Sequence, residues 1–146
     1  MSFFNSINIS STGLTAERLR MDVISKNIAN VNTTRTSSGM PYRRQVPIFK
    51  EKEGKSFSKF LSEAKDGYNG GNGVEVTKIK DDKSPFKKVY NPGHPEANEK
   101  GYVLMPNVDI VTEMINLISA SRAYEANVTA LNGSKSMAMK AIEIGR

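Results

Sequence analysis

The sequence contains neither cysteine nor tryptophan, and His94 is its only histidine. A chain without cysteine has no disulfide bond, no thiol nucleophile and no zinc site built from thiolates. His94 stands between prolines in NPGHPEAN, and a lone loop histidine is most often just solvated. The acids, bases and nucleophiles of an active site must converge, and the sequence shows no such grouping. We therefore predict no catalytic residues, no metal site and no cofactor. The sequence therefore favours a protein that is not an enzyme.

Long hydrophobic runs are also missing. No apolar stretch approaches the roughly 18 residues of a membrane-spanning helix, so we expect no membrane span. The N-terminal stretch MSFFNSINISSTGLTAERLR lacks the basic segment and the following apolar segment of a secretory signal peptide. Passage out of the cytoplasm would therefore need another route.

Positive charge is in excess but is not concentrated on one element. The net charge is +6, and residues 35–66 hold eight basic and four acidic residues, whereas both ends are close to neutral. Nucleic-acid-binding proteins usually gather Lys and Arg on one face of a helix or sheet. We therefore predict no nucleic-acid partner. A small basic module that binds nucleic acid or an anionic surface through residues 35–66 is the alternative function, and a steep salt dependence of binding would distinguish it.

The N-terminal segment has the apolar spacing of a helix that lies along another helix. One row contains Ile7, Leu14, Met21 and Ile28, and a second row beside it contains Ile24 and Val31. We predict a continuous helix over about 12–31, with Thr12 or Thr15 as its cap and a helical extension before it.

Three asparagines crowd the end of this helix, in the stretch SKNIANVNT (25–33). Asparagine is a mediocre helix former because its amide competes for nearby backbone groups. Asn32 suits the end of a helix because asparagine tolerates left-handed backbone angles. Asn27 and Asn30 precede that end and flank Ile28. A polar side chain beside an apolar seam fixes helix register at some cost in stability, so we expect these two to fix the seam or to contact neighbouring subunits.

The middle of the chain predicts short strands joined by long loops. QVPIF (45–49) alternates around Pro47, which restricts it to the edge of a sheet. Residues 73–80 and 86–90 are two further expected strands, and residues 91–101 are expected to be a loop.

The C-terminal segment predicts one long helix over about 108–143, with Asn107 as its cap. One apolar row continues for over four heptads: Ile110, Met114, Leu117, Tyr124, Val128, Leu131, Ala138 and Ile142. A second stripe contains Val111, Ile115 and Ile118. One N-terminal helix cannot cover both, so either the middle region or other subunits must cover the second stripe.

These stretches resemble the bacterial flagellar axial proteins, which are the rod, hook and hook-associated proteins. SKNIANVNT ends a helix that begins near S-x-x-G-L-x-A, as in that family. YNPGHPEANEKGYVLMPNVDIVTEM (90–114) resembles the proximal-rod branch, and SRAYEANVTALN (121–132) resembles the C-terminal helix of the family. The similarity covers about 1–48 and 74–146.

The resemblance implies a structural subunit of the basal-body rod, the drive shaft that transmits torque from motor to hook. It implies that the terminal helices line a helical tube, with a β-rich region outside. The partners implied are other copies of the chain, proximal and distal rod subunits, the rod-base adaptor and the flagellar type III export apparatus. It also implies export without a cleaved signal peptide, into a rod that crosses the periplasm or cell wall.

We therefore expect an α+β fold whose long terminal helices pair as an antiparallel, coiled-coil-like hairpin. Residues 1–34 and 107–146 are expected to form a discontinuous helical core, and residues 35–106 a small β-rich region with a flexible segment around 51–73. The residues expected to pack the helices or contact other subunits are Leu14, Met21, Ile24, Asn27, Ile28, Asn30, Val31, Ile110, Met114, Leu117, Tyr124, Asn127, Val128, Leu131 and Ile142.

Overall fold

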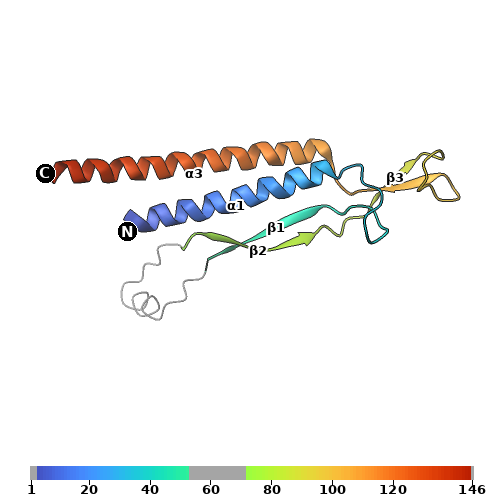
Figure 1. Ribbon diagram of the computed structural model, residues 1–146, viewed down its shortest axis with the longest axis horizontal. Helices are drawn as coiled ribbons and strands as arrows, with labels where there is room; N and C mark the ends of the chain where they lie inside the picture. Colours follow the sequence, from blue (N-terminus) through green and yellow to red (C-terminus); the bar gives the residue numbers. More distant parts are fainter. Residues whose placement is uncertain (1–2, 53–71, 146) are drawn as a thin grey trace. The chain divides into compact units, whose positions relative to one another are not determined.

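The computed structural model describes residues 3–52 and 72–145 (Figure 1). Its elements are α1 (Phe3–Ala29), β1 (Gln45–Glu51), β2 (Val74–Asp81), β3 (Lys87–Tyr90), β4 (Tyr102–Met105) and α3 (Ile110–Ile144). Long helices at both ends and small antiparallel sheets between them make an α+β protein, which confirms the predicted class. The flexible segment predicted around 51–73 lies outside the described residues except at its two ends.

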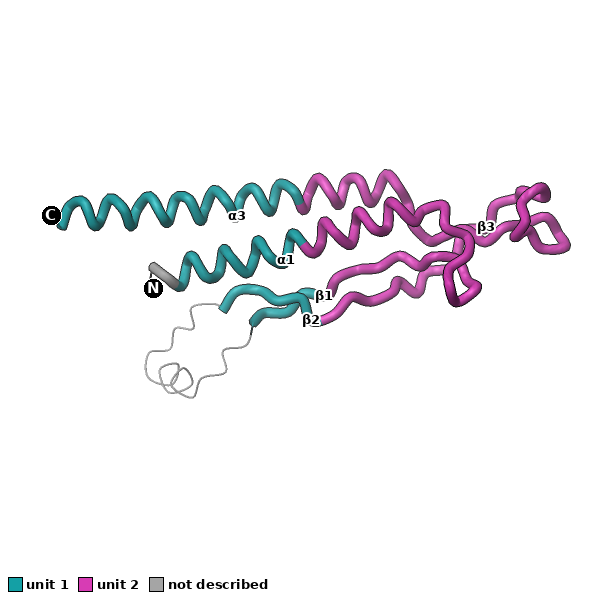
Figure 2. The backbone as a smooth tube through the Cα atoms, viewed as in Figure 1, with its two compact units in different colours: residues 1–18, 49–77, 121–146 teal, residues 19–48, 78–120 magenta. Residues whose placement is uncertain are grey.

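The chain divides into two compact units, and each draws on distant parts of the sequence (Figure 2). The first unit contains residues 1–18, 49–77 and 121–146, and the second contains residues 19–48 and 78–120. Both long helices and both strands of the β1–β2 sheet contribute residues to each unit. Neither helix, over the residues that the structure describes, has an apolar stretch sufficient to cross a membrane.

Helix α1 begins at Phe3, which confirms the helical extension predicted before residue 12, whereas the predicted cap at Thr12 or Thr15 is wrong. The hydroxyls of both threonines point back into the helix instead of capping it. Thr12 Oγ1 donates to the Ile9 carbonyl at 2.7 Å, and Thr15 Oγ1 donates to the Ser11 carbonyl at 3.1 Å. Because these bonds satisfy the hydroxyls inside the helix, the run of Ser and Thr does not interrupt it.

The two sheets each contain two strands, β1 with β2 and β3 with β4. In the second sheet the strands are antiparallel, with Val89 opposite Val103 and Tyr90 opposite Tyr102. The two tyrosine rings meet edge to face, with centroids 5.4 Å apart. Strand β4 was not predicted, because its four residues (YVLM) are all apolar or aromatic and show no alternation of apolar and polar side chains.

Gly73 in the first unit allows the start of β2 to lie against α1. Its φ is +84°, and an added Cβ would overlap Thr12 Oγ1. That hydroxyl accepts a hydrogen bond from the Val74 amide at 3.2 Å, which anchors β2 to the helix. Only glycine meets both the backbone angle and the close approach.

Replacing Gly73 with alanine should lower the free energy of unfolding by about 2–4 kcal/mol, because a strained backbone angle and a steric overlap add together. Urea denaturation followed by circular dichroism measures this change. The matched control is Gly133→Ala in α3, where an added Cβ meets nothing within 4 Å. That control should be neutral or stabilising by up to about 1 kcal/mol, and equal losses for the two variants would contradict the assignment.

Candidate functional site: a buried polar cluster and an exposed helix face

Asn27 of α1 is 1% exposed, and its side chain makes four hydrogen bonds inside the second unit. Its Nδ2 donates to the backbone carbonyl of Gln45 and to Glu113 Oε2, each at 2.9 Å. Its Oδ1 accepts from the Tyr42 hydroxyl and from the backbone N–H of Gln45, each at 2.9 Å. Because a side-chain amide has two N–H donors and two acceptor lone pairs, this capacity is full. Asn27 therefore joins α1 to β1 and α3 of its own chain.

Glu113 of α3 is a carboxylate whose side chain is only 1% exposed. Its Oε1 accepts a hydrogen bond from Arg44 Nε at 2.9 Å, and Arg44 Nη2 lies 2.8 Å from the same oxygen. Removing a carboxylate from water is costly unless a cation and hydrogen-bond donors surround it. Arg44 and Asn27 supply these groups. We call Asn27, Tyr42, Arg44, Gln45 and Glu113 the Asn27–Glu113 cluster.

Asp82 and Tyr42 carry pKa shifts caused by this environment. Hydrogen bonds from Ser84 hold the pKa of the Asp82 carboxyl below its usual value, and Arg44 adds to the effect at 3.4 Å. Burial raises the pKa of the Tyr42 hydroxyl, and the negative charges of Asp81 and Glu113 raise it further. Tyr42 is therefore a neutral hydrogen-bond donor to Asn27 at physiological pH.

The predicted cap at Asn107 is wrong, because its side chain bonds to other segments. Asn107 Oδ1 accepts from the Arg44 amide at 2.8 Å, and its Nδ2 donates to the Asp82 carbonyl at 3.1 Å. Asp109 caps α3 instead, since its Oδ2 accepts from the Thr112 amide at 3.0 Å. The Thr112 hydrogen bonds lower the pKa of the exposed Asp109 carboxyl, as expected for an acid at a helix N-terminus.

Asn30, not Asn32, closes the end of α1, and the closure is local. Its Nδ2 donates to the Lys26 carbonyl at 2.9 Å, and its Oδ1 accepts from the Thr33 hydroxyl at 3.2 Å. Among the described residues only glycines have a positive φ, so Asn32 does not adopt the left-handed angle expected of it. The three asparagines thus differ in role, and only Asn27 lies in a seam between elements.

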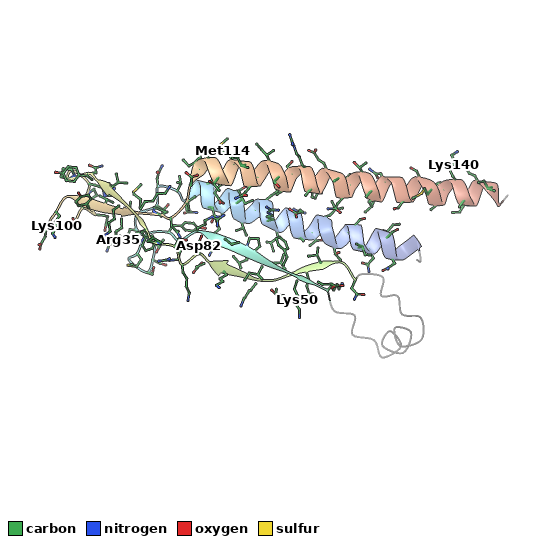
Figure 3. The ribbon with its side chains drawn as sticks, turned by 180° about the vertical axis from the view of Figure 1, so that it is seen from behind. Arg35, Lys50, Asp82, Lys100, Met114 and Lys140 are labelled. Carbon is green, nitrogen blue, oxygen red and sulfur yellow. The ribbon has the colours of Figure 1, made fainter. Side chains whose placement is uncertain are left out.

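The part of α3 in the second unit presents large apolar side chains to solvent (Figure 3). These residues, which we call the outer face of α3, are Ile110, Val111, Met114, Ile115 and Ile118, with exposed fractions of 44–65%. The opposite side of the same helix buries Glu113 and Ala120. At about 100° per residue, Val111, Ile115 and Ile118 all lie within about 40° of the direction opposite to Glu113.

The structure separates the residues predicted to pack the helices into two groups. Those at least partly shielded by their own chain are Leu14, Met21, Ile24, Asn27, Ile28, Asn30, Val31, Leu117, Tyr124, Asn127, Val128 and Leu131. Those exposed are Ile110, Met114 and Ile142, at 44%, 53% and 67%. The sequence pattern missed Glu113 because an acidic residue in the first turn of a helix suggests a solvated position at the positive end of the helix dipole. The burial of this carboxylate can be recognised only in the folded structure, where Arg44 lies beside it.

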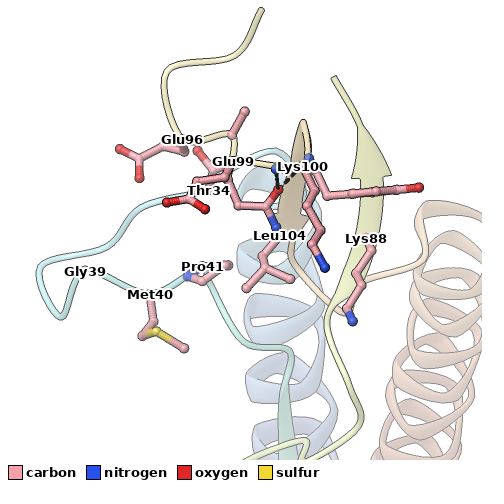
Figure 4. Close-up of a pocket in the computed structure, with 12 residues that line it drawn as sticks. Thr34, Gly39, Met40, Pro41, Lys88, Glu96, Glu99, Lys100 and Leu104 are labelled. Carbon is pink, nitrogen blue, oxygen red and sulfur yellow. Dashed lines mark hydrogen bonds between the residues drawn. The ribbon is translucent and has the colours of Figure 1, made fainter. Parts of the chain in front are cut away.

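An open hollow in the second unit lies between the loop at residues 34–41 and the β3–β4 pair (Figure 4). Its lining includes Met40, Pro41, Leu104, Lys88 and Lys100. At its edge, Glu96 forms an ion pair with Arg35 at 3.0 Å.

Nowhere in residues 3–52 and 72–145 do three or more His, Asp or Glu side chains gather as a metal site requires.

Family comparisons cover both ends of the chain. Residues 7–35 match the family described as "Flagella basal body rod protein". Residues 99–144 match "Flagellar basal body rod FlgEFG protein C-terminal". The two matches include most of α1 and all of β4 and α3.

Relatives that align over the full length are flagellar rod proteins. "Flagellar basal-body rod protein FlgC" of Bacillus subtilis is 50% identical, over 100% of both chains. The protein of the same name from Borreliella burgdorferi is 54% identical, over 99% of this chain and 98% of its own. That of Escherichia coli O157:H7 is 39% identical over 100% of both. These findings confirm the resemblance seen in the sequence, and the chain belongs to the FlgC family of flagellar basal-body rod proteins, structural subunits of the rod and not enzymes.

Proposed function

We propose that this subunit joins the rod by packing the outer face of α3 against helices of neighbouring subunits. The observation that carries the proposal is the apolar stripe of Val111, Met114, Ile115 and Ile118, each 53–65% exposed. Scattered exposed apolar residues are ordinary, but a contiguous apolar stripe marks a surface that binds another protein. An amphipathic helix is a suitable partner because its own apolar face can cover the stripe.

The neighbours we propose are other copies of this chain and other rod proteins: proximal and distal subunits and the adaptor at the rod base. Membership of the FlgC family supports these partners. In the assembled rod, which crosses the periplasm or cell wall, the subunit would transmit torque from motor to hook. It would reach the rod through the flagellar type III export apparatus, without a cleaved signal peptide.

We infer that α1 and α3 pair as an antiparallel, coiled-coil-like hairpin. Within the first unit, an added Cβ on Gly13 would lie 3.0 Å from Asn127 Oδ1, so the two helix segments approach closely there. Within the second unit, Asn27 bonds directly to Glu113. Residues 1–34 and 107–146 would then form the helical core, and residues 35–106 the β-rich region outside it.

Burial suggests how the residues predicted for packing divide between these two roles. Leu117, Tyr124, Val128 and Leu131 are shielded and would serve the pairing of α3 with α1. Met114 is exposed and would serve contacts with neighbouring subunits.

Replacing Ile115 with aspartate should abolish rod assembly while leaving the subunit folded, because it places a charge in the centre of the outer face. The variant would be expressed in cells that lack their own copy. Swimming in soft agar and the number of isolated basal bodies measure assembly, and circular dichroism of the purified subunit measures folding.

The matched control is Ile115→Leu, which keeps an apolar side chain of the same volume and should support normal swimming. Wild-type numbers of basal bodies with Ile115→Asp would contradict the proposed assembly surface.

A further inference from the structure

We propose that Glu113 is a positioning residue that sets the rotation of α3 about its own axis. By directing its carboxylate to Asn27 and Arg44, it turns the apolar stripe of the helix away from the subunit and toward solvent. The inference rests on the proposed function only in assigning the outer face of α3 to contacts with neighbouring subunits. The rotational setting itself concerns the second unit alone.

The apolar pattern by itself favours a different rotation. Ile110, Met114 and Leu117 form the row that the sequence predicts to face inward. At about 100° per residue, the centre of that row lies roughly 70° from the direction of Glu113. In the structure Glu113 faces inward at 1% exposure, whereas Met114 is 53% exposed. The helix is therefore rotated away from the setting that would bury the most apolar surface of this row.

Hydrogen bonds account for the observed setting. Turning α3 by about 70° would carry the Glu113 carboxylate away from Asn27 Nδ2, now 2.9 Å distant, and from Arg44 Nε, also 2.9 Å distant. The Arg44 side chain is itself held, since its Nη1 lies 3.4 Å from Asp82 Oδ2. An inward polar side chain specifies one packing arrangement among several of similar apolar burial, at some cost in stability.

This setting has a consequence for assembly. A helix that buried Ile110 and Met114 against its own chain would satisfy part of its apolar surface internally. The remaining exposed surface would be smaller and would face another direction, so a neighbouring helix would lose its contact. Glu113 thus keeps the outer face available until a second subunit covers it.

The test replaces Glu113 with methionine, an unbranched apolar residue of similar length, and reads the rotation by thiol labelling. The natural chain has no cysteine, so single reporters can be introduced without background. Met114→Cys reports the outer side of α3, and Asn116→Cys reports a half-buried position on the other side of Glu113. Each reporter is placed in the wild-type, Glu113→Met and Glu113→Gln chains, and a maleimide measures its reaction rate.

In the Glu113→Met chain we expect the Met114→Cys thiol to react about tenfold more slowly and the Asn116→Cys thiol to react faster, since rotation exchanges their exposure. Glu113→Gln keeps a polar side chain directed inward, so both rates should stay near those of the wild-type chain. Unchanged rates at both positions in the Glu113→Met chain would overturn the proposal. Faster labelling at both, which loosening or unfolding produces, would also overturn it.

A separate measurement distinguishes this inference from the proposed function. Cells that carry Glu113→Met without a reporter should assemble few basal bodies, although the purified subunit remains helical. If the labelling rates change as expected but basal bodies form normally, Glu113 still sets the rotation, and the outer face of α3 is not the assembly surface.

Discussion

Replacing Asn27 with leucine should lower the free energy of unfolding by about 3–5 kcal/mol, because it leaves several buried polar groups without partners at once. The Tyr42 hydroxyl and the Gln45 amide each lose their acceptor, and Glu113 loses one of its two donor side chains. Leucine fills the space of asparagine but supplies none of these bonds. Urea denaturation of the purified subunit at neutral pH measures the loss.

The matched control is Asn30→Leu, three residues further along the chain and just past the end of α1. The hydrogen bonds of the Asn30 side chain are local, to the Lys26 carbonyl and the Thr33 hydroxyl, so its replacement should cost about 0.5–1 kcal/mol. If the two variants lose similar stability, the four buried hydrogen bonds of Asn27 contribute no more to the free energy of unfolding than the local bonds of Asn30.

Replacing Arg44 with methionine should lower the free energy of unfolding by a similar amount, about 3–5 kcal/mol, because the Glu113 carboxylate stays buried without its cation. The neighbouring Arg43 provides the control. Its guanidinium lies 4.3 Å from the centre of the Phe86 ring and donates to the carbonyls of Asp82 and Ser84. Arg43→Met should cost only about 1 kcal/mol, since no buried charge depends on it.

A second substitution should suppress the Arg44→Met defect. When Glu113→Met is added, no uncompensated charge remains, and replacement of a buried ion pair by apolar residues is often neutral. The double variant should therefore recover most of the lost stability, a coupling that a double-mutant cycle quantifies. A double variant as unstable as Arg44→Met alone would show that Arg44 stabilises the unit by some other contact.

Periodicity was sufficient to predict the two long helices and the α+β class. The C-terminal helix was predicted within two residues at its start and one at its end, because its heptad spacing is uninterrupted by proline. Three of the four strands were also predicted. These features depend on local patterns, which a single sequence displays directly.

The caps and the inward face of α3 were not predictable in the same way. Asn107 and Asp109 are both good N-cap residues, and the choice between them depends on the Arg44 amide, which comes from 63 positions earlier. The burial of Glu113 likewise depends on Arg44, 69 positions away. Local pattern identifies residues able to cap or pack, but long-range hydrogen bonds decide which of them do so.

The bonds of Asn27 also bear on the order in which the second unit folds. Two of its partners, Tyr42 and Gln45, lie 15 and 18 positions along the chain, whereas Glu113 lies 86 positions away. Closing a long loop costs more chain entropy than closing a short one, and distant contacts form more slowly. We therefore expect the corner between α1 and β1 to close before α3 docks. The arrangement of the surface offered to neighbours would then form late in folding.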